Sequence, residues 1–396
     1  MSSITQNKEG LKVLITGSII QLFLGIIYVW SVFVMPVSEA FSWEVDSVKL
    51  MTSFMLCFFV VGILTGGKLQ MKIGAEKVVL TGGLMLAAGM LASAFLTPAV
   101  KQLMYITYGI IGGFGVGAGY NAILSTAQKW FPQNRGFATG VSVCTFGFST
   151  VIFAPLVRAL INNFDVRNTF LILAAGFFVV VLALFKFVRL PDDSAQAGAA
   201  SASLLEKKQY MVTETIKTKK FYFLTLSLMF ATAAYFILNP SFITFSVERG
   251  LSANIGTVIV MLTGIANAVG RLVMPMLSDK IGREKTAIIT ILVTAISALL
   301  LCFAQGFLVI VSIAAIAFCF GGYPGVYVVL TADYFGIKNV GSNYGAVMIG
   351  FAISALTFPM IIGMIGNDIV KFIVLAAMAL AGVLLMFILK ASKNKG

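Results

Sequence analysis

Residues 72–77 read KIGAEK and residues 280–285 read KIGREK, 208 positions further along the chain. Each copy is a short polar turn between two long apolar stretches. The agreement continues downstream, because GAGYNA at 117–122 has a counterpart in GGYPGV at 321–326. Two pairs of glycines correspond in the same way, namely Gly136 with Gly341 and Gly140 with Gly345. A repeat in the same order over most of the chain predicts two copies of one structural unit.

The composition is that of a membrane protein. Hydrophobic residues make up 59% of the 396 residues and charged residues 11%, with a mean hydropathy of +0.99. Ordinary soluble domains are about one quarter charged, and no soluble core could bury this much apolar surface. We therefore expect an all-α membrane protein with twelve transmembrane helices in two six-helix bundles. The stretches long enough to cross a bilayer are 13–37, 50–67, 78–96, 103–127, 136–161, 170–188, 221–245, 255–277, 287–307, 309–332, 341–365 and 369–389.

The distribution of basic residues predicts the orientation. If both termini are cytoplasmic, the inner loops and tails hold 21 of the 28 Lys and Arg residues and the outer loops hold six. Basic residues accumulate on the cytoplasmic side of membrane proteins, so we expect a multi-pass protein of a prokaryotic inner membrane with both termini inside. The net charge of +13 is explained by topology, and nucleic acid is not an expected partner. The first apolar stretch is too long for a signal-peptide core and is interpreted as an uncleaved helix.

A change of composition separates the two copies. Residues 191–204 read PDDSAQAGAASASL and are small and polar, and residues 206–220 are rich in charge. This composition is typical of a flexible cytoplasmic linker. The expected domains are an N-terminal bundle at 1–190, the linker at 191–219 and a C-terminal bundle at 220–396.

The residues that most enzymes use are missing from the predicted spans. The chain contains no histidine, and its four cysteines lie far apart inside apolar stretches. No Asp or Glu lies deep in any span, so we find no set of residues for covalent chemistry and no spacing typical of metal ligands. The sequence predicts neither an enzyme nor a cofactor. The cysteines are Cys57, Cys144, Cys302 and Cys319.

Several motifs at matching helix positions resemble the major facilitator superfamily. LSDKIGREK at 277–285 is similar to the cytoplasmic loop signature of that superfamily. Three further stretches and Arg271 resemble its oxalate/formate antiporter branch, which is related to the monocarboxylate transporters. The resemblance implies the major facilitator fold, with a substrate site near the middle of the membrane. The stretches are QLFLGIIYVWSVF at 21–33, KWFPQNRGFATG at 129–140 and NYGAVMIGFA at 343–352.

Arg271 is the only charged residue deep in a predicted span, eight residues before Asp279 and so about 12 Å deeper along a helix. A charge at that depth costs at least ~2.5–3.5 kcal/mol on insertion scales, so it needs a partner or a function. Its guanidinium stays protonated and matches a carboxylate with two parallel hydrogen bonds. The alternative to a substrate-binding role is that the Arg271 side chain extends to the membrane surface and has only a structural role. The resemblance implies that this arginine binds the substrate carboxylate. Asn267, one turn earlier, either orients the guanidinium or bonds the substrate.

Aromatic and polar residues of other spans complete the predicted site. A tyrosine offers a hydroxyl to a carboxylate oxygen and a ring to an alkyl chain, although membrane-interface positions and helix packing are alternatives. The resemblance implies that the first, fourth and tenth helices line the cavity. The candidates there are Tyr28, Tyr120, Asn121, Tyr323 and Tyr327, and Phe351 is added from the eleventh span.

The resemblance also implies a gate on the cytoplasmic side. Asp279 and Arg283 match the pair that latches this side in the superfamily, and Lys72 is assigned to topology and gating. The first copy carries Met71 and Ala75 where the acid and the arginine usually stand, which puts a first-half latch in doubt.

The missing charges narrow the expected substrate. The eleventh span, 341–365, has no charged residue, whereas the family's oxalate exchangers carry a second basic residue there. One cation balances one anionic charge, so we expect a secondary transporter of monocarboxylates such as lactate, formate, acetate or pyruvate. The lack of an intramembrane proton carrier favours exchange or facilitated transport over proton symport. The alternatives are an oxalate:formate-type antiporter and, from another class, a membrane receptor or sensor for carboxylates. The protein is expected to function as a monomer.

Overall fold

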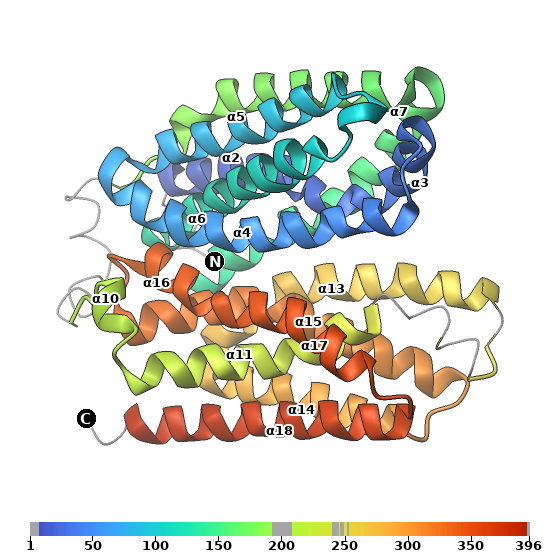
Figure 1. The fold of residues 1–396 in the computed structure, drawn as a ribbon. Coiled ribbons are helices and arrows are strands. Elements are labelled where there is room, and N and C mark those ends of the chain that lie inside the picture. The colour runs from blue at the N-terminus through green and yellow to red at the C-terminus, as the bar shows by residue number, and fades with distance from the viewer. Residues whose placement is uncertain (1–7, 192–207, 240–244, 246–248, 252, 394–396) are drawn as a thin grey trace. The chain divides into compact units, whose positions relative to one another are not determined.

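The computed structural model describes residues 8–191, 208–239, 245, 249–251 and 253–393, and these residues are almost entirely helical (Figure 1). No β-strand occurs among the residues that it describes. Most of the predicted linker, 192–207, lies outside the described residues, as do the two ends of the chain. The expected all-α fold is therefore confirmed.

The first half of the chain contains helices that match the predicted apolar stretches. A short 3₁₀ stretch, η1, separates α2 from α3 in the first crossing, and a π-helical stretch, η3, begins the fourth. Asp165, with φ 72°, interrupts α7 and divides it into two crossings. The elements are α2 (Lys8–Leu24), η1 (Gly25–Val29), α3 (Trp30–Phe41), α4 (Val45–Ile73), α5 (Ala75–Ala94), η2 (Pro98–Val100), η3 (Tyr105–Gly112), α6 (Gly113–Trp130), α7 (Arg135–Leu184) and η4 (Phe185–Phe187).

The second half follows the same plan, with a short helix before its first crossing. The eleventh crossing is divided between two helices, α16 and α17, which meet at Met348. The elements are α10 (Val212–Thr215), α11 (Lys219–Leu238), α13 (Ala253–Ile281), α14 (Arg283–Leu301), α15 (Phe307–Phe335), α16 (Val340–Val347), α17 (Ile349–Gly363) and α18 (Asp368–Lys393).

The repeated KIG motifs form the same turn in both halves. Helices α4 and α13 each have 29 residues and begin 208 positions apart. Each ends before a glycine with positive φ, 89° at Gly74 and 97° at Gly282, and the next helix starts directly after it. Glycine adopts this backbone conformation without the steric cost that a Cβ brings. The internal repeat is thus a repeat of helix–glycine–helix geometry as well as of sequence.

Nine helical segments among the described residues are long and apolar enough to cross a membrane. One of them, Arg135–Phe187, contains the two crossings of α7 on either side of Asp165. The segment formed by η3 and α6, and the helix α13, add two more long helices at predicted spans. Together they account for the twelve crossings expected from the sequence.

Contacts group the chain into two compact units. Unit 1 comprises Met1–Gln133, Val141–Gln209 and Gly336–Gly345, and unit 2 comprises Asn134–Gly140, Tyr210–Phe335 and Ala346–Gly396. Each unit thus includes a short segment from the other half of the sequence. The domain boundaries proposed from the linker composition stay a prediction.

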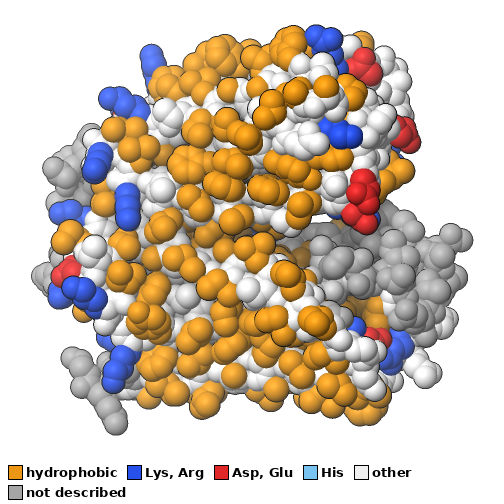
Figure 2. Space-filling view, viewed as in Figure 1, with side chains coloured by type: hydrophobic (Ala, Val, Ile, Leu, Met, Phe, Trp, Pro, Cys, Tyr) orange, Lys and Arg blue, Asp and Glu red, His pale blue; other side chains and the backbone are white. Residues whose placement is uncertain are grey.

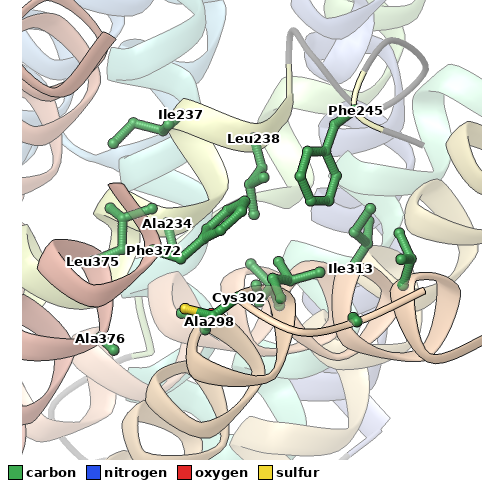
Figure 3. Packing of buried hydrophobic residues seen from close by; sticks show 14 of the residues in the cluster. Ala234, Ile237, Leu238, Phe245, Ala298, Cys302, Ile313, Phe372, Leu375 and Ala376 are labelled. Carbon is green, nitrogen blue, oxygen red and sulfur yellow. The ribbon is translucent and has the colours of Figure 1, made fainter. Parts of the chain in front are cut away.

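Unit 2 has an apolar core near one end of its helices. Leu238 of α11, Ile313 of α15 and Phe372 of α18 are all buried there. The rings of Phe245 and Phe372 meet edge to face, with centroids 5.1 Å apart. Figure 3 shows Leu238, Phe245 and Phe372 converging on the same interior space. Burial of these side chains fixes how α11, α15 and α18 pack together.

The outer surface of the helices is apolar. Large hydrophobic side chains are strongly exposed on several crossings, such as Val179 at 62% and Leu384 at 61%. On the viewed face of each unit, hydrophobic side chains cover the middle of the helices, and Lys and Arg side chains lie towards the helix ends (Figure 2). Such a surface is suited to lipid.

Candidate functional site

Arg271 and Asn267 of α13 form a hydrogen-bonded pair in unit 2. The Nε atom of Arg271 donates to the Oδ1 atom of Asn267 at 2.7 Å. Both side chains are buried, Arg271 with 4% and Asn267 with 9% of its surface exposed. The i, i+4 spacing predicted a shared helix face, and the structure places the amide as an acceptor for the guanidinium. The bond uses Nε, whereas the two terminal nitrogens form the other edge of the guanidinium fork.

Close helix packing holds this pair in place. A Cβ atom on Gly321 of α15 would overlap the carbonyl oxygen of Asn267, and a Cβ atom on Gly270 would overlap that of Phe318. The backbones of α13 and α15 are therefore in direct contact beside the Asn267–Arg271 pair. Small residues permit this approach, which is common between helices in membranes.

Tyr323 and Tyr327 are fully buried in unit 2, and their hydroxyls are engaged inside it. The Tyr323 hydroxyl lies 2.6 Å from the hydroxyl of Thr294, and the Tyr327 hydroxyl lies 2.9 Å from that of Ser227. These bonds tie α15 to α14 and to α11, which is a packing role. The sequence-based assignment of both tyrosines to the substrate is not supported by these contacts and stays a prediction.

Phe351 belongs to an aromatic cluster of unit 2 that sequence reasoning found only in part. Its ring centroid lies 5.0 Å from that of Phe236 and 5.8 Å from that of Phe320. Tyr235 stacks on Phe320 with centroids 3.8 Å apart. The cluster joins α11, α15 and α17. Phe236 and Phe320 were missed because a phenylalanine in an apolar span carries no signal by itself.

Tyr28 and Tyr120 belong to a corresponding cluster of unit 1. The Tyr120 ring centroid lies 4.8 Å from that of Phe146 and 5.3 Å from that of Phe59. The Tyr28 ring meets Phe146 edge to face at 5.4 Å. The cluster joins η1, α4, α6 and α7, so the two tyrosines predicted from separate helices contact one shared ring. Gln21 adds a buried bond from its amide to the backbone oxygen of Tyr120, 3.1 Å long.

Asn121 makes backbone contacts within unit 1. Its amide nitrogen Nδ2 donates to the carbonyl oxygen of Ile63 at 2.6 Å and to that of Gly341 at 2.7 Å. Gly341 belongs to the segment Gly336–Gly345, which unit 1 includes from the second half. These bonds give Asn121 a structural role in the described conformation. Its predicted contact with substrate stays a prediction.

The predicted gate residues lie in a charged cluster of unit 2. The Arg283 Nη2 atom lies 2.7 Å from the Oδ1 atom of Asp279, and its Nε atom lies 3.1 Å from the Oδ2 atom of Asp333. Asp333 also pairs with Arg135, and Asp279 accepts a hydrogen bond from the Phe137 backbone N–H at 3.1 Å. Arg135 and Phe137 lie in the segment Asn134–Gly140 of unit 2. This segment is therefore held to α13 and α15 by charge.

The corresponding place in unit 1 is built without a charge pair among its motif residues. Met71 and Ala75 stand where Asp279 and Arg283 stand 208 positions later, and Lys72 is exposed. Instead, Gly67 and Gly341 pack backbone to backbone, and the Ser125 hydroxyl donates to Gln70 Oε1 at 2.9 Å. The doubt about a first-half charge latch agrees with this neutral arrangement.

The fold and these residues together define a class of protein. Two copies of a helical membrane unit, with a buried arginine within a membrane-spanning helix, are typical of secondary transporters. A family model of the Major Facilitator Superfamily matches residues 15–259 and 224–396. The chain belongs to the major facilitator superfamily.

Curated relatives and a solved structure agree with this family membership. The chain is 29% identical over 352 residues to the uncharacterized transporter YhjX of Escherichia coli, covering 86% of this chain and 84% of that protein. It is 26% identical to the oxalate:formate antiporter of Oxalobacter formigenes, with 81% and 76% covered, and 25% identical to monocarboxylate transporter 13 of Rattus norvegicus, with 91% and 84% covered. The crystal structure of FucP, a transporter of the same superfamily, matches with a TM-score of 0.73 at 16% identity, covering 96% of this chain and 99% of FucP.

Proposed function

We propose that the protein is a secondary transporter that moves small monocarboxylate anions, such as lactate, formate, acetate or pyruvate, across a prokaryotic inner membrane by alternating access. The observation that carries this proposal is the buried pair of Arg271 and Asn267. Arg271 is a permanent cation, and the bond from its Nε atom to Asn267 fixes the plane of its guanidinium. A guanidinium can bind a carboxylate through two parallel hydrogen bonds, which makes a buried arginine a suitable receptor for this group.

The choice of a single carboxylate rests on the rest of the membrane-embedded sequence. The eleventh span, 341–365, has no charged residue, and it contributes Phe351, Ser354 and Thr357. The second carboxylate of a dianion would therefore find no cation in that crossing. A buried charge without a partner is costly, so a dianion would bind less well than a monoanion.

A second candidate function is exchange of oxalate for formate. It is favoured by the similarity to the oxalate:formate antiporter, which extends over 81% of this chain. The uncharged eleventh crossing argues against it. A receptor or sensor for carboxylates is the candidate from another class, and it differs from both transporters by binding without translocation.

The proposal also covers the orientation of the chain, its functional unit, the gating residues and further substrate contacts. Both chain ends are placed in the cytoplasm, and the monomer is proposed as the functional unit. Asp279 and Arg283 are assigned to gating, together with Asp333 and Arg135, which share their ion pairs. Phe351 and Tyr28 are assigned to the substrate because each belongs to an aromatic cluster of its unit.

Uptake into proteoliposomes tests the proposal. Purified protein should take up lactate and formate faster than oxalate. Comparison of uptake with and without an internal anion, and with and without a pH gradient, identifies the coupling. Arg271→Lys should lower monocarboxylate uptake at least about tenfold, because an ammonium lacks the guanidinium fork and one tenfold change corresponds to only about 1.4 kcal/mol. Arg158→Lys is the matched control, since Arg158 is exposed at the surface.

Three outcomes would contradict the proposal. Wild-type-like uptake by Arg271→Lys would remove Arg271 from the site. Equal rates for oxalate and lactate would favour the exchange of oxalate for formate. Saturable binding of lactate without any uptake would favour the receptor.

A further inference from the structure

The first and sixth crossings of unit 1 are antiparallel neighbours. The ring of Phe23 in α2 meets the ring of Phe177 in α7 edge to face, with centroids 5.4 Å apart. Nearer the start of α2, the Nζ atom of Lys12 lies 4.5 Å from the centre of the Phe187 ring in η4, which follows α7. The contacts follow the two crossings in opposite order, so the beginning of α2 lies beside the end of the sixth crossing.

Three lysines lie at this junction without an acidic partner. Lys8 and Lys12 of α2 are exposed one turn apart, and Lys186 of η4 is exposed as well. Within the part of the chain that the structure describes, none of the three forms an ion pair. Arg189 differs from them, because its guanidinium pairs with Glu9 at 2.9 Å. The preference of basic residues for one side of a membrane explains the side on which these lysines lie, but it does not require that they meet at one junction. The three lysines form the basic cluster of unit 1.

Exposed hydrocarbon continues from the basic cluster along both crossings. On α2, Ile15 and Ile19 are exposed, and helical spacing places them on the same face as the two lysines of that helix. On α7, Leu182 and Phe178 are exposed about one and two turns before Lys186. The neighbouring crossings therefore present positive charge at one end and apolar side chains along the part that faces the membrane.

The corresponding crossing of unit 2 is covered by protein at the same place. Lys220 lies 208 positions after Lys12, is only partly exposed, and has its Nζ atom 5.8 Å from the centre of the Tyr334 ring. Ser227 lies 208 positions after Ile19 and is fully buried. The internal repeat thus supplies a basic residue at the start of both crossings, whereas unit 1 combines it with an exposed apolar face.

We propose that the basic cluster and the apolar faces next to it bind an anionic phospholipid. The lysine ammonium groups donate hydrogen bonds to the phosphate oxygens of the headgroup, and opposite charges strengthen these bonds. The acyl chains pack on the exposed side chains of α2 and of the sixth crossing, which lie within the hydrocarbon of the membrane. A zwitterionic lipid binds less well, because its own ammonium offsets the phosphate charge. This inference goes beyond the proposed function and holds whichever solute the protein transports.

Native mass spectrometry of the full-length protein in detergent tests this site by lipid titration. The Kd for phosphatidylglycerol should be at least about tenfold lower than that for phosphatidylethanolamine, since each basic residue near an anionic headgroup changes the affinity about fivefold. The double variant Lys8→Gln with Lys12→Gln should therefore raise the Kd for phosphatidylglycerol about 30-fold. Lys8→Arg with Lys12→Arg should leave it near the wild-type value, because both positive charges are kept.

The internal repeat supplies the matched control. Lys217→Gln with Lys220→Gln removes the same charge at the start of the corresponding crossing of unit 2, and it should leave the Kd for phosphatidylglycerol at the wild-type value. An equal loss of affinity in this control would show that overall charge attracts the lipid, and the site would be wrong. Equal Kd values for the two lipids in the wild-type protein would overturn the site whether or not a variant folds. Displacement of phosphatidylglycerol by soluble glycerol phosphate would also overturn it, because the acyl chains would then contribute nothing.

Discussion

At the scale of single residues, Asn267 places a neutral hydrogen-bond acceptor beside the positive charge of Arg271. Its Oδ1 atom accepts a bond from the guanidinium without neutralising it. Asn267→Ala should raise the KM for lactate about 10- to 100-fold, since a hydrogen bond to a charged group contributes about 1.5–3 kcal/mol. Uptake kinetics in proteoliposomes measure this change. An unchanged KM would mean that the amide does not orient Arg271.

Asn267→Asp separates orientation from charge at the same position. An aspartate there keeps the acceptor but adds an anion beside Arg271, which then competes with the substrate carboxylate. Uptake should be low at neutral pH and should rise as the pH falls and the aspartate becomes protonated. If uptake by Asn267→Asp varied with pH no more than uptake by Asn267→Ala, the added charge would not affect the site.

Single residues also show what the sequence could predict about the site. The contact between Asn267 and Arg271 followed from helical spacing, because both lie on one regular helix. The surroundings of Tyr323 did not follow. The packing pairs Gly117 with Gly321, so Tyr120 corresponds to Pro324 and Tyr323 lies one residue away from the equivalent position. One residue is roughly 100° of helix rotation, which turns the Tyr323 hydroxyl towards Thr294 of α14.

At the scale of elements, the helix–glycine–helix turns were predictable and their partners were not. The motif at 277–285 identified Asp279 and Arg283 as a pair, and the structure confirms their contact at 2.7 Å. Asp333 and Arg135 complete the cluster from positions far away in the sequence. No local pattern links them, since their proximity results from packing of α15 and of the segment Asn134–Gly140 against α13. The neutral contact of Gly67 with Gly341 could not be predicted from the sequence for the same reason.

The charged cluster predicts how firmly the segment Asn134–Gly140 is held. Asp279→Asn removes one of the two carboxylate partners of Arg283 and weakens the acceptor for the Phe137 N–H. Backbone amides of residues 135–140 should then exchange with deuterium about 10- to 100-fold faster, because charged hydrogen bonds contribute about 1.5–3 kcal/mol. Hydrogen exchange followed by mass spectrometry measures the rate for this segment.

The internal repeat supplies a matched control for that experiment. Met71→Asn introduces the same side chain at the position 208 residues earlier, where the wild-type side chain is exposed and the nearby packing is neutral. Exchange of the segment Gly336–Gly345 should remain at its wild-type rate. Equal exchange of residues 135–140 in wild type and in Asp279→Asn would show that charge does not hold the segment.

At the scale of the whole molecule, composition and repeat determined the fold class, because both are distributed over the entire chain. Apolar stretches at regular spacing require helices, since a helix satisfies its own backbone hydrogen bonds in lipid. A second copy of each motif then requires two similar units. What composition cannot supply is the difference between the copies. That difference lies in a few positions, such as Arg271, which has Ile63 as its counterpart 208 positions earlier.

The distribution of charge makes a final prediction about how the whole chain is inserted. The inner loops and tails assigned here hold 21 basic residues and the outer loops hold six, which should place both termini in the cytoplasm. A fluorescent protein that matures only in the cytoplasm should therefore be bright when fused after Gly396. Alkaline phosphatase, which is active only outside, should be active when inserted at the loop 97–101 and inactive at the loop 131–134. The opposite pattern would reverse the orientation and assign the charged cluster around Asp279 to the outer side, where it could not act as a cytoplasmic gate.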